Sequence, residues 1–157
     1  MATRPKRKPT NFSVDQANAA LPLVRAIVGD LVELARDVYE RRRRLAVLLD
    51  GRRAGENDPY HEELVQIEHE LAKDNRRLKG YADELRQLGV KPAGSTEGWV
   101  DFPAVIDGQD AFLCWRHGEL EVLYWHPRNS NHRRRRPLAA GSVAGEDTAA
   151  GQREGES

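Results

Sequence analysis

The side chains best suited to binding or catalysis lie in one short stretch, residues 98–126, which reads GWVDFPAVIDGQDAFLCWRHGELEVLYWH. It contains all three tryptophans, the only cysteine and two of the five histidines. The guanidinium of Arg116 could hold a carboxylate or another anion through its planar fork, and nearby aromatic rings could stack on the ligand. The alternative is cross-strand ion pairing, with the aromatic rings covered by the C-terminal segment or a partner chain. The candidate binding residues are Asp101, Arg116, Glu119, Trp125 and His126.

Cys114, His117, Glu119 and His126 are also residue types that bind metal ions. On the strand register expected below, alternation places Cys114 and His126 on opposite faces of a sheet, and there is no second cysteine for a CxxC pair. The same alternation separates the Cys114 thiol from a histidine base. We therefore predict no metal site, no cofactor and no catalytic residue, and we interpret Cys114 as a structural thiol.

Two charged segments before this stretch predict long helices, over about 13–50 and 58–88. Their apolar residues recur at spacings of three and four, which is the pattern of a coiled-coil seam. The helices are expected to run antiparallel, because the loop between them is short. The first seam contains Val24, Val28, Leu31, Ala35, Val38, Leu45 and Leu49, and the second contains Leu64, Ile67, Leu71, Asp74, Leu78, Tyr81, Leu85 and Leu88.

The ends of these helices carry capping signals. Ser13 and Gln16 form a capping box at the first N-terminus. Pro22 removes one backbone hydrogen bond, so either this helix kinks or a separate helix begins near Pro22. Asp58-Pro59 suits the start of the second helix, and Gly89 suits its end.

Three strands follow a Pro/Gly/Ser linker, over about 99–106, 110–116 and 120–126. We expect a two-residue turn at His117-Gly118 and a turn centred on Gly108-Gln109. The expected apolar face then contains Val100, Phe102, Ala104, Ile106, Ala111, Leu113, Trp115, Leu120, Val122 and Tyr124.

This register pairs Phe102 with Trp115 and Leu113 with Val122, because a slip by one residue would mix the two faces. It also brings Asp101, Arg116 and Glu119 side by side on the other face, which carries Trp125 as well. The predicted fold is α+β: a long, coiled-coil-like antiparallel helical hairpin, followed by a three-stranded antiparallel β-meander packed on one end of it.

Length and composition predict one domain over 12–138, between disordered ends at 1–11 and 139–157. The 157 residues carry no net charge, so no overall field attracts nucleic acid or a membrane. A single cysteine cannot form an internal disulfide, which fits the cytoplasm. The chain has neither a signal peptide nor an apolar run long enough to span a membrane.

The expected function is that of a small interaction module, most simply a homodimer. Leu23, Ile27 and Leu34 lie outside the main seam, and we expect them to need a second partner surface. A ligand-binding or catalytic domain with a site around Arg116 is one alternative. Weak, non-specific nucleic-acid binding through the basic segments 1–10 and 132–136 is another, although 132–136 could instead fold back onto the acidic sheet region.

The motifs also resemble a known family. FSVDQANAALPLV near the start, GWVDFPA, LCWRHGE and YWH are similar to the opening and C-terminal patterns of the bacterial domain of unknown function 2203. The resemblance covers about residues 12–138, and it implies no particular activity. The family motif includes Asp101, Phe102, Pro103, Cys114, Trp115, Gly118, Glu119, Trp125 and His126.

Overall fold

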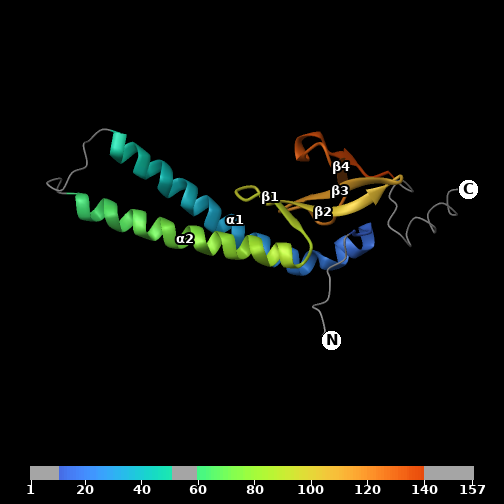
Figure 1. Cartoon of the computed structure of the whole chain (residues 1–157), viewed down its shortest axis with the longest axis horizontal. Coiled ribbons are helices and arrows are strands. Elements are labelled where there is room, and N and C mark those ends of the chain that lie inside the picture. The colour runs from blue at the N-terminus through green and yellow to red at the C-terminus, as the bar shows by residue number, and fades with distance from the viewer. Residues whose placement is uncertain (1–10, 51–59, 140–157) are drawn as a thin grey trace, which may run out of the picture.

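The computed structural model describes residues 11–50 and 60–139 (Figure 1). Two long antiparallel helices pack together, and a five-stranded antiparallel sheet lies over the end that contains the start of α1. The sheet order is β1-β2-β3-β4-β5. The elements are α1 (Val14–Asp50), α2 (His61–Gln87), β1 (Lys91–Gly94), β2 (Trp99–Ile106), β3 (Gln109–Arg116), β4 (Tyr124–Pro127), the 3-10 helix η1 (His132–Arg134) and β5 (Arg136–Pro137).

The start of α1 confirms the predicted capping box. The Ser13 N–H donates to Gln16 Oε1 at 2.9 Å, and the Gln16 N–H donates to Ser13 Oγ at 3.1 Å. The helix continues through Pro22, so the idea of a separate first helix is wrong. Ala17 and Leu21 are buried on the N-terminal side of the proline, and this packing offsets the lost hydrogen bond. The predicted start at Asp58-Pro59 lies outside the described residues.

The main core fills the space between the sheet and the first half of α1. Phe102, Leu113 and Trp115 are fully buried in it together with Val24 and Val28 of α1. Farther along the hairpin, a smaller cluster of Leu34, Val38 and Leu71 joins the two helices. The expectation that Ile27 and Leu34 need a partner chain is therefore wrong, because both are buried within the chain, whereas Leu23 is 53% exposed. No helix in the described part of the chain is both long enough and apolar enough to cross a membrane.

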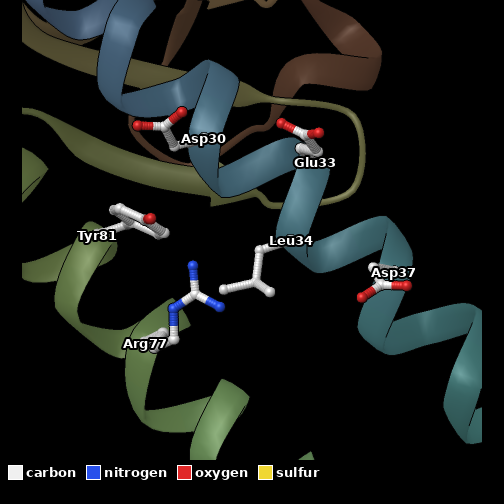
Figure 2. A pocket seen from close by; sticks show the side chains of 6 residues that line it. All are labelled: Asp30, Glu33, Leu34, Asp37, Arg77 and Tyr81. Carbon is white, nitrogen blue, oxygen red and sulfur yellow. The ribbon is translucent and has the colours of Figure 1, made fainter.

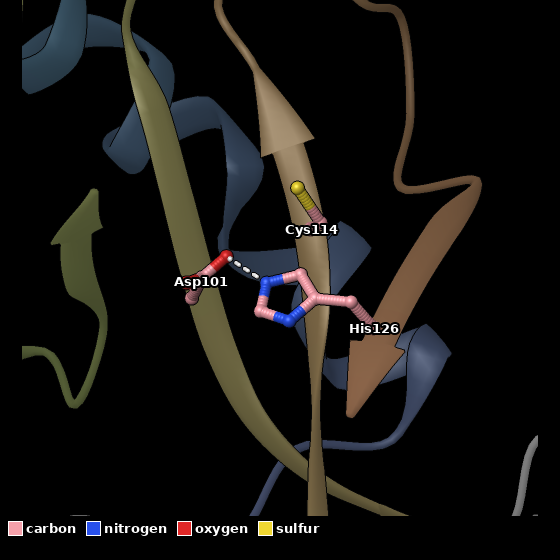
Figure 3. A group of neighbouring side chains, drawn as sticks. All are labelled: Asp101, Cys114 and His126. Atoms are coloured by element: carbon pink, nitrogen blue, oxygen red, sulfur yellow. Dashed lines mark hydrogen bonds and ion pairs between the residues drawn. The ribbon is translucent and has the colours of Figure 1, made fainter. Parts of the chain in front are cut away.

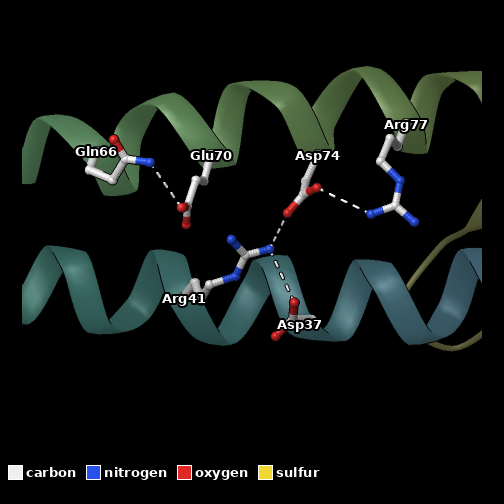
Figure 4. Close-up of polar contacts among 6 residues, drawn as sticks. All are labelled: Asp37, Arg41, Gln66, Glu70, Asp74 and Arg77. Carbon is white, nitrogen blue, oxygen red and sulfur yellow. Dashed lines mark hydrogen bonds and ion pairs between the residues drawn. The ribbon is translucent and has the colours of Figure 1, made fainter.

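A polar cluster continues the helix contact where the apolar seam is interrupted (Figure 4). Arg41 of α1 contacts both Asp74 of α2 and Asp37 of its own helix, and Arg77 contacts Asp74 at 3.3 Å. The hydrogen bond from Arg41 holds the pKa of Asp74 below its usual value. The seam charge at Asp74 is thus paired across the hairpin.

Two strands of the sheet were missed by the prediction of three. Lys91–Gly94, expected as linker, pairs with the start of β2, and Arg136–Pro137 pairs with β4. Both are edge strands, where proline is tolerated because one side of the strand has no partner that needs its N–H. A proline would also suit an edge strand at Pro103, yet β2 is internal. Its pairing with β1 ends at Asp101, before Pro103, and the Pro103 carbonyl accepts from the Phe12 N–H at 2.7 Å.

The β2–β3 hairpin closes with a two-residue turn at Asp107-Gly108, not at Gly108-Gln109. Both turn residues have positive φ, 53° and 78°, as a type I′ turn requires. Ile106 consequently pairs with Gln109, and Phe102 pairs with Leu113 instead of Trp115. The shift is an even number of residues, so the predicted faces of β2 and β3 are retained.

The β3–β4 connection is wider than the predicted tight turn, and β4 begins only at Tyr124. The indole of Trp115 donates to the Glu119 carbonyl at 2.9 Å, and the Val122 N–H donates to Asn18 Oδ1 at 2.8 Å. These contacts hold residues 119–123 out of the sheet and leave Leu120 88% exposed, although it was expected in the core.

As a result, Leu113 pairs with Trp125 and not with Val122. This shift is an odd number of residues, so it exchanges the predicted faces of Tyr124, Trp125 and His126. Val122 precedes the strand and is buried in the core, as predicted. Trp125 packs against the core, whereas Tyr124 and His126 share the outer face with Cys114.

Substitution of two glycines with similar backbone conformations can test the close contact between the sheet and α1. Gly98 and Gly108 have φ of 77° and 78°. A Cβ at Gly98 would lie 2.4 Å from the His117 Cβ and 3.0 Å from Val32, whereas a Cβ at Gly108 meets nothing within 4 Å. We expect Gly98→Ala to lower the free energy of unfolding by about 3 kcal/mol and Gly108→Ala by about 1 kcal/mol, as measured by urea denaturation followed by tryptophan fluorescence. Equal losses would contradict the close approach at Gly98.

Candidate functional site

Three side chains from neighbouring strands converge on the outer face of the sheet (Figure 3). Asp101 of β2 and His126 of β4 point toward each other with Cys114 of β3 beside them, and one potential ligand atom from each lies within 4.8 Å of the others. All three side chains are buried, with exposed fractions of 5%, 0% and 1%. The expectation that Cys114 and His126 lie on opposite faces is wrong, and with it the geometric argument against a metal site.

The imidazole of His126 is held at both ring nitrogens. Nδ1 lies 2.8 Å from the Pro127 carbonyl, and Nε2 lies 3.2 Å from Asp101 Oδ1. A carbonyl oxygen only accepts hydrogen bonds, so Nδ1 carries a proton and Nε2 is directed at the carboxylate. Burial acts to lower the pKa of His126, but the hydrogen bonds to Asp101 and Pro127 outweigh it and raise the pKa above its ordinary value.

The Cys114 thiol is neutral in this environment. Burial, reinforced by the neighbouring Asp101 carboxylate, raises its pKa to about 12, and the guanidinium of Arg135 acts in the opposite direction. A thiol with such a pKa is a poor nucleophile at neutral pH, because only the thiolate attacks. The environment of the Cys114 thiol therefore does not favour nucleophilic catalysis.

Residues 128–136, the covering segment, fold back across this outer face. The guanidinium of Arg135 lies 3.8 Å from the ring centroid of Tyr124 and 4.8 Å from that of Trp99. It also donates to both carboxylate oxygens of Glu119, at 2.6 and 3.2 Å. His132 stacks on Trp99 with centroids 4.2 Å apart. These contacts bury side chains on the sheet face opposite the two α-helices.

The structure does not bring the five predicted site residues together in one place. Asp101 and His126 meet directly, whereas Arg116 pairs with Trp99 in the sheet and lies exposed over that ring, at 5.2 Å. Glu119 accepts from the Arg116 backbone N–H and binds Arg135. Trp125 is half-buried on the core face. The predicted row of Asp101, Arg116 and Glu119 across three strands is not formed, because the β2–β3 register differs by two residues.

Sequence reasoning missed Cys114 as a member of the group, although one signal was available. Asp-Gly is the usual pair for a type I′ turn, and a turn at Asp107-Gly108 places Cys114 directly opposite Asp101. The position of His126 had no such signal, since the length of the 117–123 connection depends on contacts with Asn18 and Trp115.

Apart from this buried cluster, a hollow of about 540 Å³ lies between the two helices (Figure 2). Its acidic side chains come from α1, and Arg77 and Tyr81 come from α2. Only Leu34 among its lining residues is buried. The hollow is an open polar groove where the helices diverge, and it lacks the buried reactive groups of the outer sheet face. It is lined by Asp30, Glu33, Leu34, Asp37, Arg77 and Tyr81.

The fold and this group define an α+β protein in which a helical hairpin supports a sheet with a buried Asp–Cys–His cluster. The family model described as "Uncharacterized conserved protein (DUF2203)" matches residues 10–138. The chain belongs to the DUF2203 family, which confirms the resemblance of its motifs. Neither the curated proteins nor the solved structures contain a match to this chain.

The pairing of Arg135 with Glu119 can be measured by a double-mutant cycle with Arg135→Ala and Glu119→Ala. We expect a coupling energy of about 1–2 kcal/mol in urea denaturation, because the contact is bidentate and both side chains are only about one-fifth exposed. The matched control is the pair Lys79–Asp83 on α2, whose side chains are 74% and 44% exposed. Its cycle should give less than about 0.5 kcal/mol. Equal couplings would mean that the covering segment is not held by Arg135.

The burial of Cys114 predicts a protected thiol. In the native, chelator-treated protein at pH 8, a disulfide reagent should label it at least about 100-fold more slowly than in denaturant, because little thiolate is present and access is blocked. Absorbance of the released thiol measures the rate, and Cys114 is the only cysteine to react. Rapid stoichiometric labelling of the folded protein would contradict the described burial.

Proposed function

We propose that this protein is a cytoplasmic interaction module that self-associates through the far half of its helical hairpin, with a second copy as the partner. The observation that supports this most is the length of α1 beyond its own core. Val38 is its last buried residue, and no side chain from Tyr39 to Asp50 is buried. The single, buried cysteine is consistent with a reducing compartment.

Apolar side chains in this half of the hairpin face solvent. Val47 is 71% exposed, Leu48 is 38% exposed and Val65 of α2 is 47% exposed. A hollow of about 230 Å³ lies beside Leu48, between the helices. Two packed helices bury only one stripe each, so a second pair of helices is a natural cover for the remaining apolar surface. The hollow is lined by Leu48, Tyr60, Glu63, Leu64 and Ile67.

The charges in this half favour another copy of the same chain. Residues 42–44 of α1 are three exposed arginines, whereas the first half of α2 carries exposed acids and few bases. A two-fold interface is self-complementary, so α1 of each copy can lie against α2 of the other with opposite charges in contact. The acids are Glu62, Glu63, Glu68 and Glu70.

The first test is the dependence of mass on concentration, measured by light scattering. We expect a monomer–dimer equilibrium in the micromolar range, since the exposed patch is small for a stable interface. Val47→Ser should shift it toward monomer by about tenfold or more, because Val47 would be buried against the partner. Leu120→Ser is the matched control, since Leu120 is even more exposed but lies beside the sheet. A monomer at all concentrations would overturn the proposal.

A charge exchange separates a second copy from other partners. Arg42→Glu with Arg43→Glu should weaken the dimer, because like charges would then face each other across the two-fold axis. Adding Glu62→Arg and Glu63→Arg should restore it. If the dimer is lost and the added arginines do not restore it, α1 of one copy does not lie against α2 of the other.

A ligand site around Arg116 is the second candidate, supported by the exposed Arg116 guanidinium over Trp99. A planar carboxylate would quench Trp99 fluorescence, and Arg116→Ala would abolish the quenching. Nucleic-acid binding has less support, because Arg135 is paired with Glu119 and Arg136 lies over Trp125. Residues 1–10, the other basic segment, lie outside the described residues.

A further inference from the structure

We propose that Asp101, Cys114 and His126 bind a divalent transition-metal ion of the zinc class. The ligand atoms are a carboxylate oxygen, Sγ and Nε2, and a fourth position is left for water or a small molecule. This inference is independent of self-association, since all three residues lie on the sheet and not on the far half of the hairpin.

The orientation of His126 is that of a metal ligand. Its Nδ1–H donates to the backbone carbonyl of Pro127, which fixes the ring and leaves Nε2 directed at Asp101. Metal-binding histidines almost always donate their other N–H to a carbonyl or carboxylate in this way. The outer-shell contact and the ligand atom are thus both in place.

The distances suit a tetrahedral ion. Ligands at about 2.0–2.3 Å from zinc lie roughly 3.3–3.7 Å from one another. Nε2 and Asp101 Oδ1 are 3.2 Å apart, and no two of the three ligand atoms are separated by more than 4.8 Å. Small side-chain rotations of Cys114 and Asp101 would complete the shell, with no change in the strands.

The donor set selects the class of ion. A thiolate is a soft ligand and an imidazole a borderline one, and together they favour zinc, cobalt or copper over magnesium or calcium. On binding, the S–H bond of Cys114 breaks, and the proton that His126 Nε2 shares with Asp101 is also released, so that both protons pass to solvent while sulfur–metal and nitrogen–metal bonds form without oxidation or reduction. One thiolate and one carboxylate then neutralise the two positive charges of the ion, so the buried site has no net charge.

The site is also built into rigid structure. Each ligand comes from a different strand, and the covering segment lies over the same face, where His132 and Arg135 pack on Trp99 of β2. Sites with three protein ligands and an open position are those in which zinc binds a reacting water or substrate atom. A competing interpretation is a buried imidazolium–carboxylate pair beside a neutral thiol, which would take up no metal ion.

Cobalt binding distinguishes the proposed metal site from a buried imidazolium–carboxylate pair. The full-length chain, without a tag and stripped by a chelator, is titrated with Co²⁺ and followed by absorbance. We expect one equivalent to bind, with visible bands of four-coordinate cobalt and a sulfur-to-cobalt band in the near ultraviolet. Since Cys114 is the only cysteine, that band can arise from no other residue. Zn²⁺ should displace the cobalt and remove both signals.

The variants are chosen to separate binding from folding. Cys114→Ser should lose the near-ultraviolet band, and His126→Ala should weaken Co²⁺ binding by at least about 100-fold. His69→Ala is the control, because His69 is exposed on α2 and should change nothing. Circular dichroism verifies that each variant is folded.

A measurement on the unmodified chain covers the case in which the variants do not fold. Zn²⁺, but not Mg²⁺, should raise its Tm, because an ion that binds only the folded state stabilises it. The proposal is overturned if the folded protein shows no sulfur–cobalt band at saturating Co²⁺, if that band survives in Cys114→Ser, or if Zn²⁺ leaves the Tm unchanged.

Discussion

Side chains alternate between the faces of a strand, so the registers of β2, β3 and β4 decide which groups of this protein meet. The turn at Asp107-Gly108 fixes the first register and sets Asp101 against Cys114. The wide connection before β4 fixes the second and turns His126 to the same side. A change of one residue in either register would send one of the three ligand-type side chains into the apolar core.

Asp101 and His126 find their hydrogen-bond partners within the sheet, but their burial also requires a cover over the outer face. Neither α1 nor α2 lies over the outer face, and the covering segment takes that place through the contacts of Arg135 with Glu119, Tyr124 and Trp99. A buried carboxylate, imidazole and thiol then share a small volume with little water, where electrostatic interactions are strong. This is a suitable environment for binding an ion, and an unsuitable one for a free nucleophile.

The helix α1 connects two surfaces with different physical character. Its first half packs under the sheet and belongs to the main core. The apolar side chains of its second half pack against α2, and Arg36 donates to the Thr96 carbonyl at 2.8 Å. The polar contact of Arg41 with Asp74 lies within this second half and keeps the helices together where the apolar seam is interrupted. The proposed self-association and the proposed metal site therefore use separate surfaces, because Asp101, Cys114 and His126 all lie on the sheet.

Local patterns were enough for the two helices, for the β2–β3 hairpin and for the family of this protein. The spacing of Val24, Val28 and Leu31, the capping box at Ser13 and the alternation in β2 and β3 predicted two helices and an apolar sheet face, since each depends on neighbours close in sequence. The two edge strands and the register of β4 were decided by the tertiary structure. They depend on contacts between distant residues, such as Asn18 with Val122 and Lys91 with Asp101, which no local periodicity encodes. For the same reason the meeting of Cys114 with His126 could be found only in three dimensions.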